Sequence, residues 1–117
     1  MMTPRQIAEK IVETISKKIG RDIKMLKVDN VTVLADYFVI CTANSAVQIK
    51  SLCDELEAVM EALGEKPLRR EGRRQGGWVL MDFGCVVVHV FMEETREFYS
   101  LERLWADAED LDISHLI

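Results

Sequence analysis

An aspartate and a histidine that could form an acid–base couple, Asp82 and His89, flank the turn-forming pair Phe83-Gly84. If this pair forms a tight hairpin turn, Trp78 faces His89, and Asp82 lies on the same face of the two strands. A carboxylate beside an imidazole raises the pKa of the imidazole towards the range that acid–base catalysis uses. The pattern assigns no serine, cysteine or lysine nucleophile to the same place, and structural networks also contain such pairs. It therefore favours a structural histidine packed on Trp78 over a catalytic one.

A basic, glycine-rich segment spans residues 68–77 and carries the arginines Arg69, Arg70, Arg73 and Arg74. Guanidinium groups bind phosphate in a bidentate manner, and glycines let the backbone approach a ligand closely. The segment is therefore a candidate RNA contact. It lacks the interleaved aromatic side chains of single-strand binders, and its glycine spacing fits neither a Walker loop nor a dinucleotide motif. The alternative interpretation is a mobile loop in solvent.

The two carboxylates of Asp110-Leu111-Asp112 have the spacing of a metal-binding pair in phosphoryl-transfer enzymes. They lie in the tail, residues 106–117, which has four acidic residues and no lysine or arginine. Such a terminus is typical of a solvated acidic segment, so we expect the tail to be frayed or loosely docked. The sequence predicts no catalytic metal and no cofactor.

Both tryptophans and one of the two tyrosines lie in the last 40 residues of the chain. Tryptophan and tyrosine are favoured anchors of protein interfaces. The candidate anchors are Trp78, Tyr99, Leu104 and Trp105. Alternatively, these side chains only cover an edge of a sheet, and the pattern alone leaves both interpretations open.

The sequence also predicts two amphipathic helices, which belong to the fold that carries these residues. The first is expected over residues 4–19, because a capping-box start at Thr3 precedes apolar residues at helical spacing. The second is expected over residues 46–63, after a second capping box at Ser45. Each helix has one apolar face, so both are expected to pack on a core.

Apolar runs of strand length occur between and after the helices. They predict strands over residues 23–28, 37–42, 78–83 and 86–92. The order of helix, strand, strand, helix and further strands predicts a single α/β domain that consists of a mixed β-sheet and flanking helices.

The composition is that of one globular domain. The chain has 117 residues, of which 49% are apolar, and this supplies one core without disulfide staples. Its net charge of −5 excludes a domain that as a whole neutralises nucleic acid or an anionic membrane surface. The three cysteines match no zinc or redox spacing and are expected to be core residues in a reducing compartment. With no signal-peptide pattern and no membrane-spanning apolar run, we expect a cytoplasmic protein without membrane contact.

Three stretches of the sequence resemble the signature of the Iojap, or ribosomal silencing factor, family. They are ADYFVICT at residues 35–42, WVLMDFGCVVVHVF at residues 78–91 and REFYSLERLW at residues 96–105. The order W-x-x-x-D-x-G, H-x-F and R-x-F-Y-x-L-x-x-L-W is specific, and the resemblance covers nearly the whole chain. The sequence departs from the family pattern where the family often has Gly, His and Asp, at Ala43, Gln48 and Cys85.

The resemblance implies a nucleotidyltransferase-like sheet without the catalytic motif, since the sequence lacks the Gly-Ser turn and the paired strand carboxylates of active nucleotidyltransferases. It implies a non-enzymatic protein that binds the large ribosomal subunit through its fourteenth protein (uL14). Binding there blocks joining of the small subunit and represses translation under nutrient limitation. The resemblance also implies a homodimer in the free state. The alternative is a nucleotide-handling enzyme that retains a pocket on the same fold.

The resemblance also assigns roles to particular residues. The implied partner-binding residues are Trp78, Asp82, Tyr99, Glu102, Leu104 and Trp105, with Asp82 and Glu102 as acidic contacts to a basic ribosomal protein. The candidate rRNA contact is formed by Arg69, Arg70, Arg73 and Arg74. The family domain is expected over residues 1–105, followed by an acidic C-terminal tail over residues 106–117.

Overall fold

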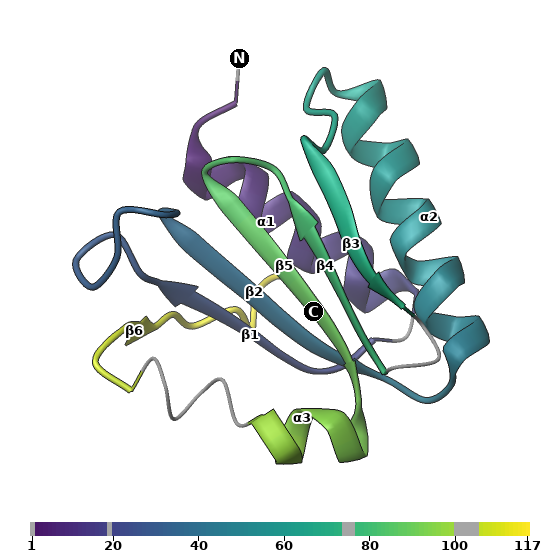
Figure 1. Cartoon of the computed structure of the whole chain (residues 1–117). Helices are drawn as coiled ribbons and strands as arrows, with labels where there is room; N and C mark the ends of the chain where they lie inside the picture. Colours follow the sequence, from purple (N-terminus) through teal and green to yellow (C-terminus); the bar gives the residue numbers. More distant parts are fainter. Residues whose placement is uncertain (1, 19, 74–76, 100–105) are drawn as a thin grey trace.

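The computed structural model contains one mixed β-sheet of six strands (Figure 1). In chain order the strands are β1 (Arg21–Lys27), β2 (Tyr37–Ala43), β3 (Arg69–Arg73), β4 (Trp78–Asp82), β5 (Val86–Met92) and β6 (Glu109–Asp110). In space their order is β3-β4-β5-β2-β1-β6. The structure describes residues 2–18, 20–73, 77–99 and 106–117, with the backbone alone at 73 and 97–99. No helix among these residues is long and apolar enough to cross a membrane.

The central strands β2 and β5 run parallel, and the other neighbouring strands pair antiparallel. All residues of β2 are buried, as expected for a continuous apolar run that is covered on both faces. The register of the parallel pair runs from Tyr37 opposite Val86 to Ala43 opposite Met92. This arrangement confirms the predicted mixed sheet in a single α/β domain.

The two predicted helices are present as α1 (Pro4–Lys17) and α2 (Ala46–Ala62). Thr3 begins α1 through a complete capping box with Gln6. The Ser45 hydroxyl accepts a backbone N–H in the first turn of α2. Both helices are therefore confirmed, and each ends slightly before its predicted boundary.

α1 and α2 lie on one face of the sheet and form the larger core with it (Figure 1). Apolar side chains at helical spacing on the helices pack against alternate residues of the strands, among them Ile11, Leu52, Leu56, Val39 and Val88. This alternation leaves the other residues of each strand on the opposite face of the sheet.

Two of the three cysteines are confirmed as core residues. Cys41 and Cys53 are free, buried thiols, whereas Cys85 is half-buried. Burial raises the pKa of the Cys53 thiol to about 11 and raises the pKa of Cys41 further. Both buried thiols therefore stay protonated and unreactive at neutral pH.

The opposite face of the sheet carries a smaller apolar cluster. Its buried members are Leu26, Val28, Ala35, Phe38, Ile40 and Phe91. The short helix α3 (Glu93–Tyr99) follows β5 directly and lies at the end of the sheet where β5 ends and β1 begins (Figure 1). α1 and α2 cover the first face and leave this second face uncovered.

The basic segment at residues 69–73 is an edge strand, β3, so the interpretation as a mobile loop is wrong for this part. It pairs antiparallel with β4 from Arg69 opposite Asp82 to the end of the strand. Ion pairs hold it on both faces, from Arg69 to Asp82 over 3.1 Å and from Arg70 to Asp54 of α2 over 2.8 Å. Charged side chains on a short edge strand also discourage edge-to-edge aggregation.

The hairpin between β4 and β5 has a different register from the predicted one. Trp78 lies opposite Phe91 rather than His89, and Asp82 lies opposite Val87. The turn is centred one residue later than expected, because Gly84 takes the positive φ of 87° and donates its N–H to Asp82 Oδ1 over 2.7 Å. The observed pairing is shifted by two residues from the predicted one, and a shift by an even number leaves each side chain on the same face. Trp78, Asp82 and His89 therefore share one face as predicted.

The acidic tail is attached to the sheet, so of the two expectations, a frayed or a loosely docked tail, the frayed one is wrong. Its residues Glu109 and Asp110 form β6 beside β1, and the Asp110 carboxylate accepts a hydrogen bond from Lys24 over 3.0 Å. Ile113 is buried against the larger core. Apolar residues at intervals, rather than net charge, thus decide how this segment is placed. The division into residues 1–105 and 106–117 stays a prediction.

Candidate partner-binding face

A row of side chains lines β3 and β4 on the sheet face that α1 and α2 leave uncovered. We call this row the open face and define it as Arg69, Glu71, Trp78, Leu80 and Asp82. These residues share a face because strand side chains alternate and the register sets Arg69 opposite Asp82 and Glu71 opposite Leu80. Each of the five is exposed or half-buried. Of the predicted partner-binding residues, the structure brings Trp78 and Asp82 together here.

An aromatic cluster fixes the orientation of Trp78. The indole stacks on Phe91 with ring centres 5.2 Å apart, and its Nε1–H donates to Nδ1 of His89 over 3.3 Å. Phe38 packs edge-on against His89 at 5.0 Å. Because the indole N–H is used within the chain, Trp78 offers a partner an oriented, apolar ring surface.

His89 is a buried hydrogen-bond acceptor, which confirms the predicted structural histidine packed on Trp78. It is 5% exposed, and this burial lowers its pKa to about 4. The imidazole is therefore neutral at neutral pH, and because Nδ1 accepts the indole proton, its own proton resides on Nε2. Nε2 has no hydrogen-bond partner among the residues that the structure describes.

The carboxylate of Asp82 has other partners than His89, so the acid–base couple does not form. One oxygen accepts the Gly84 N–H over 2.7 Å and the other accepts from Arg69 Nε over 3.1 Å. Asp82 thus closes the hairpin turn and holds the edge strand. The pKa of His89 is lowered by burial, the opposite of the direction that a neighbouring carboxylate would give.

Ion pairs across the open face are solvent-exposed. Arg69 bridges Asp82 and Glu71, the second over 3.2 Å, and the side chains of Arg69 and Glu71 are each more than half exposed. Exposed pairs of this kind contribute only about 0–1 kcal/mol. The Glu71 carboxylate can therefore exchange Arg69 for a cationic group of a partner at little cost, whereas Asp82 is only 18% exposed and also holds the hairpin turn.

A hollow of about 190 Å³ lies on the open face, lined by Glu71, Gly72, Trp78 and Leu80. Gly72 contributes only backbone atoms to its wall. Gly72 has a φ of +98°, and a Cβ there would lie 2.3 Å from the carbonyl oxygen of Trp78. An indole ring, a leucine and one carboxylate at the rim fit an apolar partner side chain beside a cationic group.

Sequence reasoning missed Gly72 and Leu80 as parts of this site. The alternation along Trp78-Val79-Leu80-Met81-Asp82 contains a signal for Leu80, because it places this residue on the same face as Trp78 and Asp82. Gly72 carried no comparable signal, since its role depends on the close approach of the Trp78 backbone.

The predicted arginines do not gather into one patch in the described structure. Arg69 lies on the open face, whereas Arg70 points to the other face and bonds Asp54 and Glu57 of α2. These acidic partners raise the pKa of Arg70 against the effect of its burial. The side chain of Arg73 and all of Arg74 lie outside the described residues.

The C-terminal signature residues lie mostly outside the described structure. Tyr99 is the last residue of α3 and is described by its backbone alone. Glu102, Leu104 and Trp105 follow in the undescribed segment 100–105. Their predicted role in partner binding stays a prediction.

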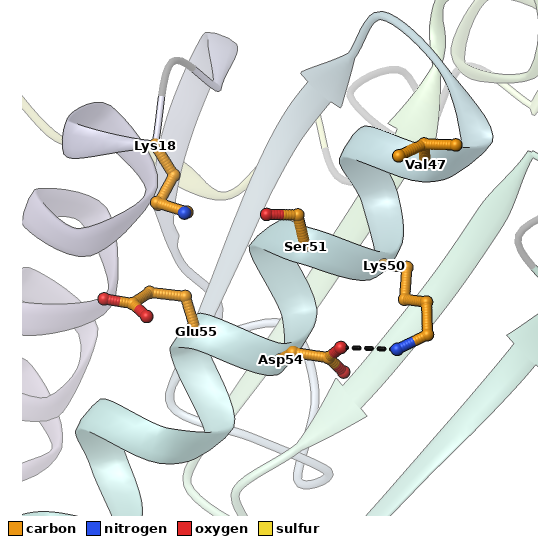
Figure 2. Close-up of a pocket in the computed structure, with 6 residues that line it drawn as sticks. All are labelled: Lys18, Val47, Lys50, Ser51, Asp54 and Glu55. Carbon is orange, nitrogen blue, oxygen red and sulfur yellow. Dashed lines mark hydrogen bonds and ion pairs between the residues drawn. The ribbon is translucent and has the colours of Figure 1, made fainter.

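A second hollow lies on the helical layer, between the end of α1 and the first half of α2 (Figure 2). Lys18 and Glu55 extend from the two helices into the space between them (Figure 2). Lys50 bonds Asp54 over 2.7 Å, and this bond, together with that from Arg70, lowers the pKa of Asp54. Because charges of both signs alternate, the hollow has no net field that would select a charged ligand. Across the described ranges, no group of three or more His, Cys, Asp and Glu side chains could hold a metal ion.

Two solved structures that are similar to this chain come from bacteria. A crystal structure of a Chromobacterium violaceum protein has a TM-score of 0.86 and 31% sequence identity, and covers 90% of this chain and 88% of that chain. A Bacillus halodurans structure has a TM-score of 0.75 at 34% identity, and covers 92% of this chain and 95% of that chain. The mixed sheet with flanking helices is thus shared with both proteins.

Sequence comparisons name the family. The ribosomal silencing factor of Halalkalibacterium halodurans is 34% identical over 116 residues, which are 99% of each chain. A mouse protein named mitochondrial assembly of ribosomal large subunit protein 1 is 31% identical over 98 residues, covering 81% of this chain and 43% of the mouse protein. The family model described as ribosomal silencing factor during starvation matches residues 1–117. This chain therefore belongs to the ribosomal silencing factor family, as its signature indicated.

Proposed function

We propose that this protein binds the large ribosomal subunit, hinders joining of the small subunit and so represses translation when nutrients are limiting. The observation that carries the proposal is the match of the whole chain to the family model for silencing during starvation. The name of the mouse relative, which refers to assembly of the large subunit, supports this subunit as the partner. The proposed mechanism is steric and uses a surface of the domain.

The proposed contact is between uL14 and the open face, extended by the signature residues Tyr99, Glu102, Leu104 and Trp105. Trp78 and Leu80 supply oriented apolar area, and aromatic side chains of this kind dominate interface energies. Glu71 and Asp82 supply carboxylates for cationic groups of the partner. With a net charge of −5, the chain is attracted to basic ribosomal proteins and repelled by bare rRNA.

The arginines of β3 have a supporting role in this proposal, as an rRNA contact beside the protein contact. Arg69 has the most exposed side chain of the ion-paired arginines on this strand. Arg70 is only 30% exposed and is held against two acidic residues of α2, so exposure, and not the number of ion pairs, distinguishes it from Arg69. We therefore expect a small rRNA contribution, made by Arg69 with Arg73 and Arg74.

We propose that the protein acts without catalysis, in the cytoplasm, and as a homodimer when free. The named relatives are silencing factors, which supports a regulatory role. The best-placed acid–base candidates, Asp82 and His89, serve the hairpin turn and the indole instead. The apolar part of the open face, Trp78 and Leu80, supports self-association because a second copy would cover it.

Co-sedimentation with isolated large subunits tests the proposal. The wild-type chain is expected to sediment with large subunits to the same extent with and without added nucleotide. Leu80→Asp places a charge in the hollow and is expected to weaken binding at least about tenfold, because burying an unpaired carboxylate costs more than about 1.4 kcal/mol.

A matched control lies on the helical layer. Val47 is an exposed apolar residue of α2, so Val47→Asp makes the same chemical change away from the open face. This variant is expected to bind as the wild type does. Nucleotide-dependent binding would favour the nucleotide-handling alternative, and equal binding by the two aspartate variants would contradict the proposed face.

A further inference from the structure

The helix α3 is too short to hold itself in place. It spans Glu93–Tyr99, and isolated helices of this length are not stable in water. Its position at the end of the sheet must therefore come from tertiary contacts (Figure 1). This position matters because Tyr99, its last residue, begins the C-terminal part of the proposed partner surface.

Arg96 connects α3 to two strands of the sheet. Its Nη1 donates to the backbone oxygen of Asp22 over 2.6 Å and to Thr42 Oγ1 over 2.8 Å. Thr42 is 1% exposed, so this hydroxyl is an acceptor inside the protein. Hydrogen bonds from a charged donor are about twice as strong as neutral ones. One guanidinium thus joins α3 to the start of β1 and to the end of β2.

A bulge in β1 contains the backbone oxygen of Asp22 that accepts the hydrogen bond from Arg96. The register between β1 and β2 shifts between Arg21 and Lys24, and Asp22 lies within this bulge. Asp22 has a φ of 49°, a left-handed conformation that non-glycine residues rarely adopt. The bulge thus presents the Asp22 carbonyl oxygen to Arg96 of α3.

A second tie between the same elements is weaker. Arg21 Nη2 lies 3.7 Å from Glu93 Oε2, and both side chains are largely exposed, at 41% and 63%. An exposed ion pair at this distance contributes little. Among the described side-chain ties of α3 to the start of β1, the Arg96 hydrogen bond is therefore the stronger one.

We propose that Arg96 is a positioning residue for partner binding, which fixes α3 on the β1 bulge and so sets the place at which this helix ends, at Tyr99, before the later signature residues begin. This inference rests on the proposed function, since it assigns those residues to the contact with the large subunit. Arg96 itself does not need to touch the partner. A structural role alone would change stability, whereas a positioning role changes affinity in protein that remains folded.

Three variants and a control separate these roles. Arg96→Met removes the charged donor, Thr42→Val removes one acceptor with little change of shape, and Arg96→Lys keeps the charge without the planar fork. The control, Arg5→Met, removes an arginine of α1 whose bond is to Glu9 on the surface. The measurements are thermal unfolding, amide hydrogen exchange over residues 93–99 and the Kd for isolated large subunits.

In folded Arg96→Met we expect the α3 amides to exchange at least about tenfold faster and the Kd to rise at least about tenfold. Arg96→Lys and Thr42→Val are expected to give intermediate changes in both, and Arg5→Met none. A lower melting temperature with an unchanged Kd would show a structural role only and overturn the inference, as would unchanged exchange of α3. If the wild-type chain does not bind large subunits, the proposed function falls first and the inference with it.

Discussion

At the scale of single residues, His89 links the stability of the fold to the geometry of the open face. Its Nδ1 orients Trp78, and this requires the neutral form of the ring. Burial among aromatic side chains supplies that form by lowering the pKa from 6.5 to about 4. The same burial that fixes the indole therefore makes the fold sensitive to acid.

The pH dependence of unfolding tests this state of His89. The unfolded chain binds the proton near pH 6.5 and the folded chain only near pH 4, so stability present above pH 6.5 is lost as pH falls towards 4. The difference corresponds to about 3 kcal/mol at most. We expect His89→Phe to remove this loss in urea unfolding measured at pH 7, 6, 5 and about 4.5.

His115 provides the matched control, because its side chain is 60% exposed. His115→Gln is expected to keep the slope of the wild type between pH 6.5 and 4. If His89→Phe loses stability with acid as steeply as the wild type, His89 is not the neutral, buried group described here.

Gly72 is the residue at which β3 approaches the backbone of β4 too closely for a side chain. We expect Gly72→Ala to lower the free energy of unfolding by about 1–3 kcal/mol, since a Cβ meets the Trp78 carbonyl at 2.3 Å in a strained conformation. Gly64→Ala is the control, because Gly64 also has a positive φ but its Cβ would meet nothing within 4 Å. Chemical denaturation of both variants should show a larger loss for Gly72→Ala. Equal losses would mean that conformation alone, and not the contact with Trp78, fixes glycine at this position.

At the scale of elements, the sequence predicts best where local pattern and burial agree. Thr3 and Ser45 begin two helices whose apolar faces meet the sheet, and the run at Tyr37–Ala43 is buried as its composition requires. These elements were predictable because each one's period matches the surface that it buries. The alternation of side chains along β4 also placed Trp78 and Asp82 on one face, although the predicted register of the hairpin was wrong.

Two elements escaped prediction because distant contacts create them. Strand β3 is arginine-rich and lacks an apolar period, and its ion pairs reach residues far away in sequence. The tail forms β6 because Lys24 donates a hydrogen bond to Asp110 and because Ile113 packs into the larger core. The residues that β3 and the tail contact cannot be recognised from the local sequence. For the same reason, the sequence did not predict that the open face lies along β3.

The docking of the tail predicts a measurable difference between two isoleucines. Ile113 is 9% exposed and Ile117 is 65% exposed. Ile113→Ala is expected to lower the free energy of unfolding by about 2 kcal/mol, and Ile117→Ala by less than about 0.5 kcal/mol. Urea denaturation of both variants measures this difference. If both variants have negligible effects on the free energy of unfolding, the tail is not docked and the expectation of a frayed tail is correct.

At the scale of the whole molecule, the charge distribution predicts how binding to the proposed basic partner depends on salt. The chain carries 20 acidic and 15 basic residues, and several arginines are already paired with carboxylates. We expect the association rate with large subunits to fall as salt rises from about 50 to about 300 mM, because screening weakens long-range attraction. The dissociation rate is expected to change less. Stopped-flow or surface-binding kinetics would measure both rates, and an association rate that is indifferent to salt would contradict electrostatic steering.

The central claim is that the open face of this family member blocks joining of the ribosomal subunits. The most direct measurement is the fraction of small and large subunits that associate, resolved on sucrose gradients, with wild-type protein, Leu80→Asp or Val47→Asp added at equal concentration. We predict that wild type and Val47→Asp lower this fraction to the same extent, whereas Leu80→Asp leaves subunit joining unaffected. Inhibition by Leu80→Asp equal to that of the wild type would contradict the claim.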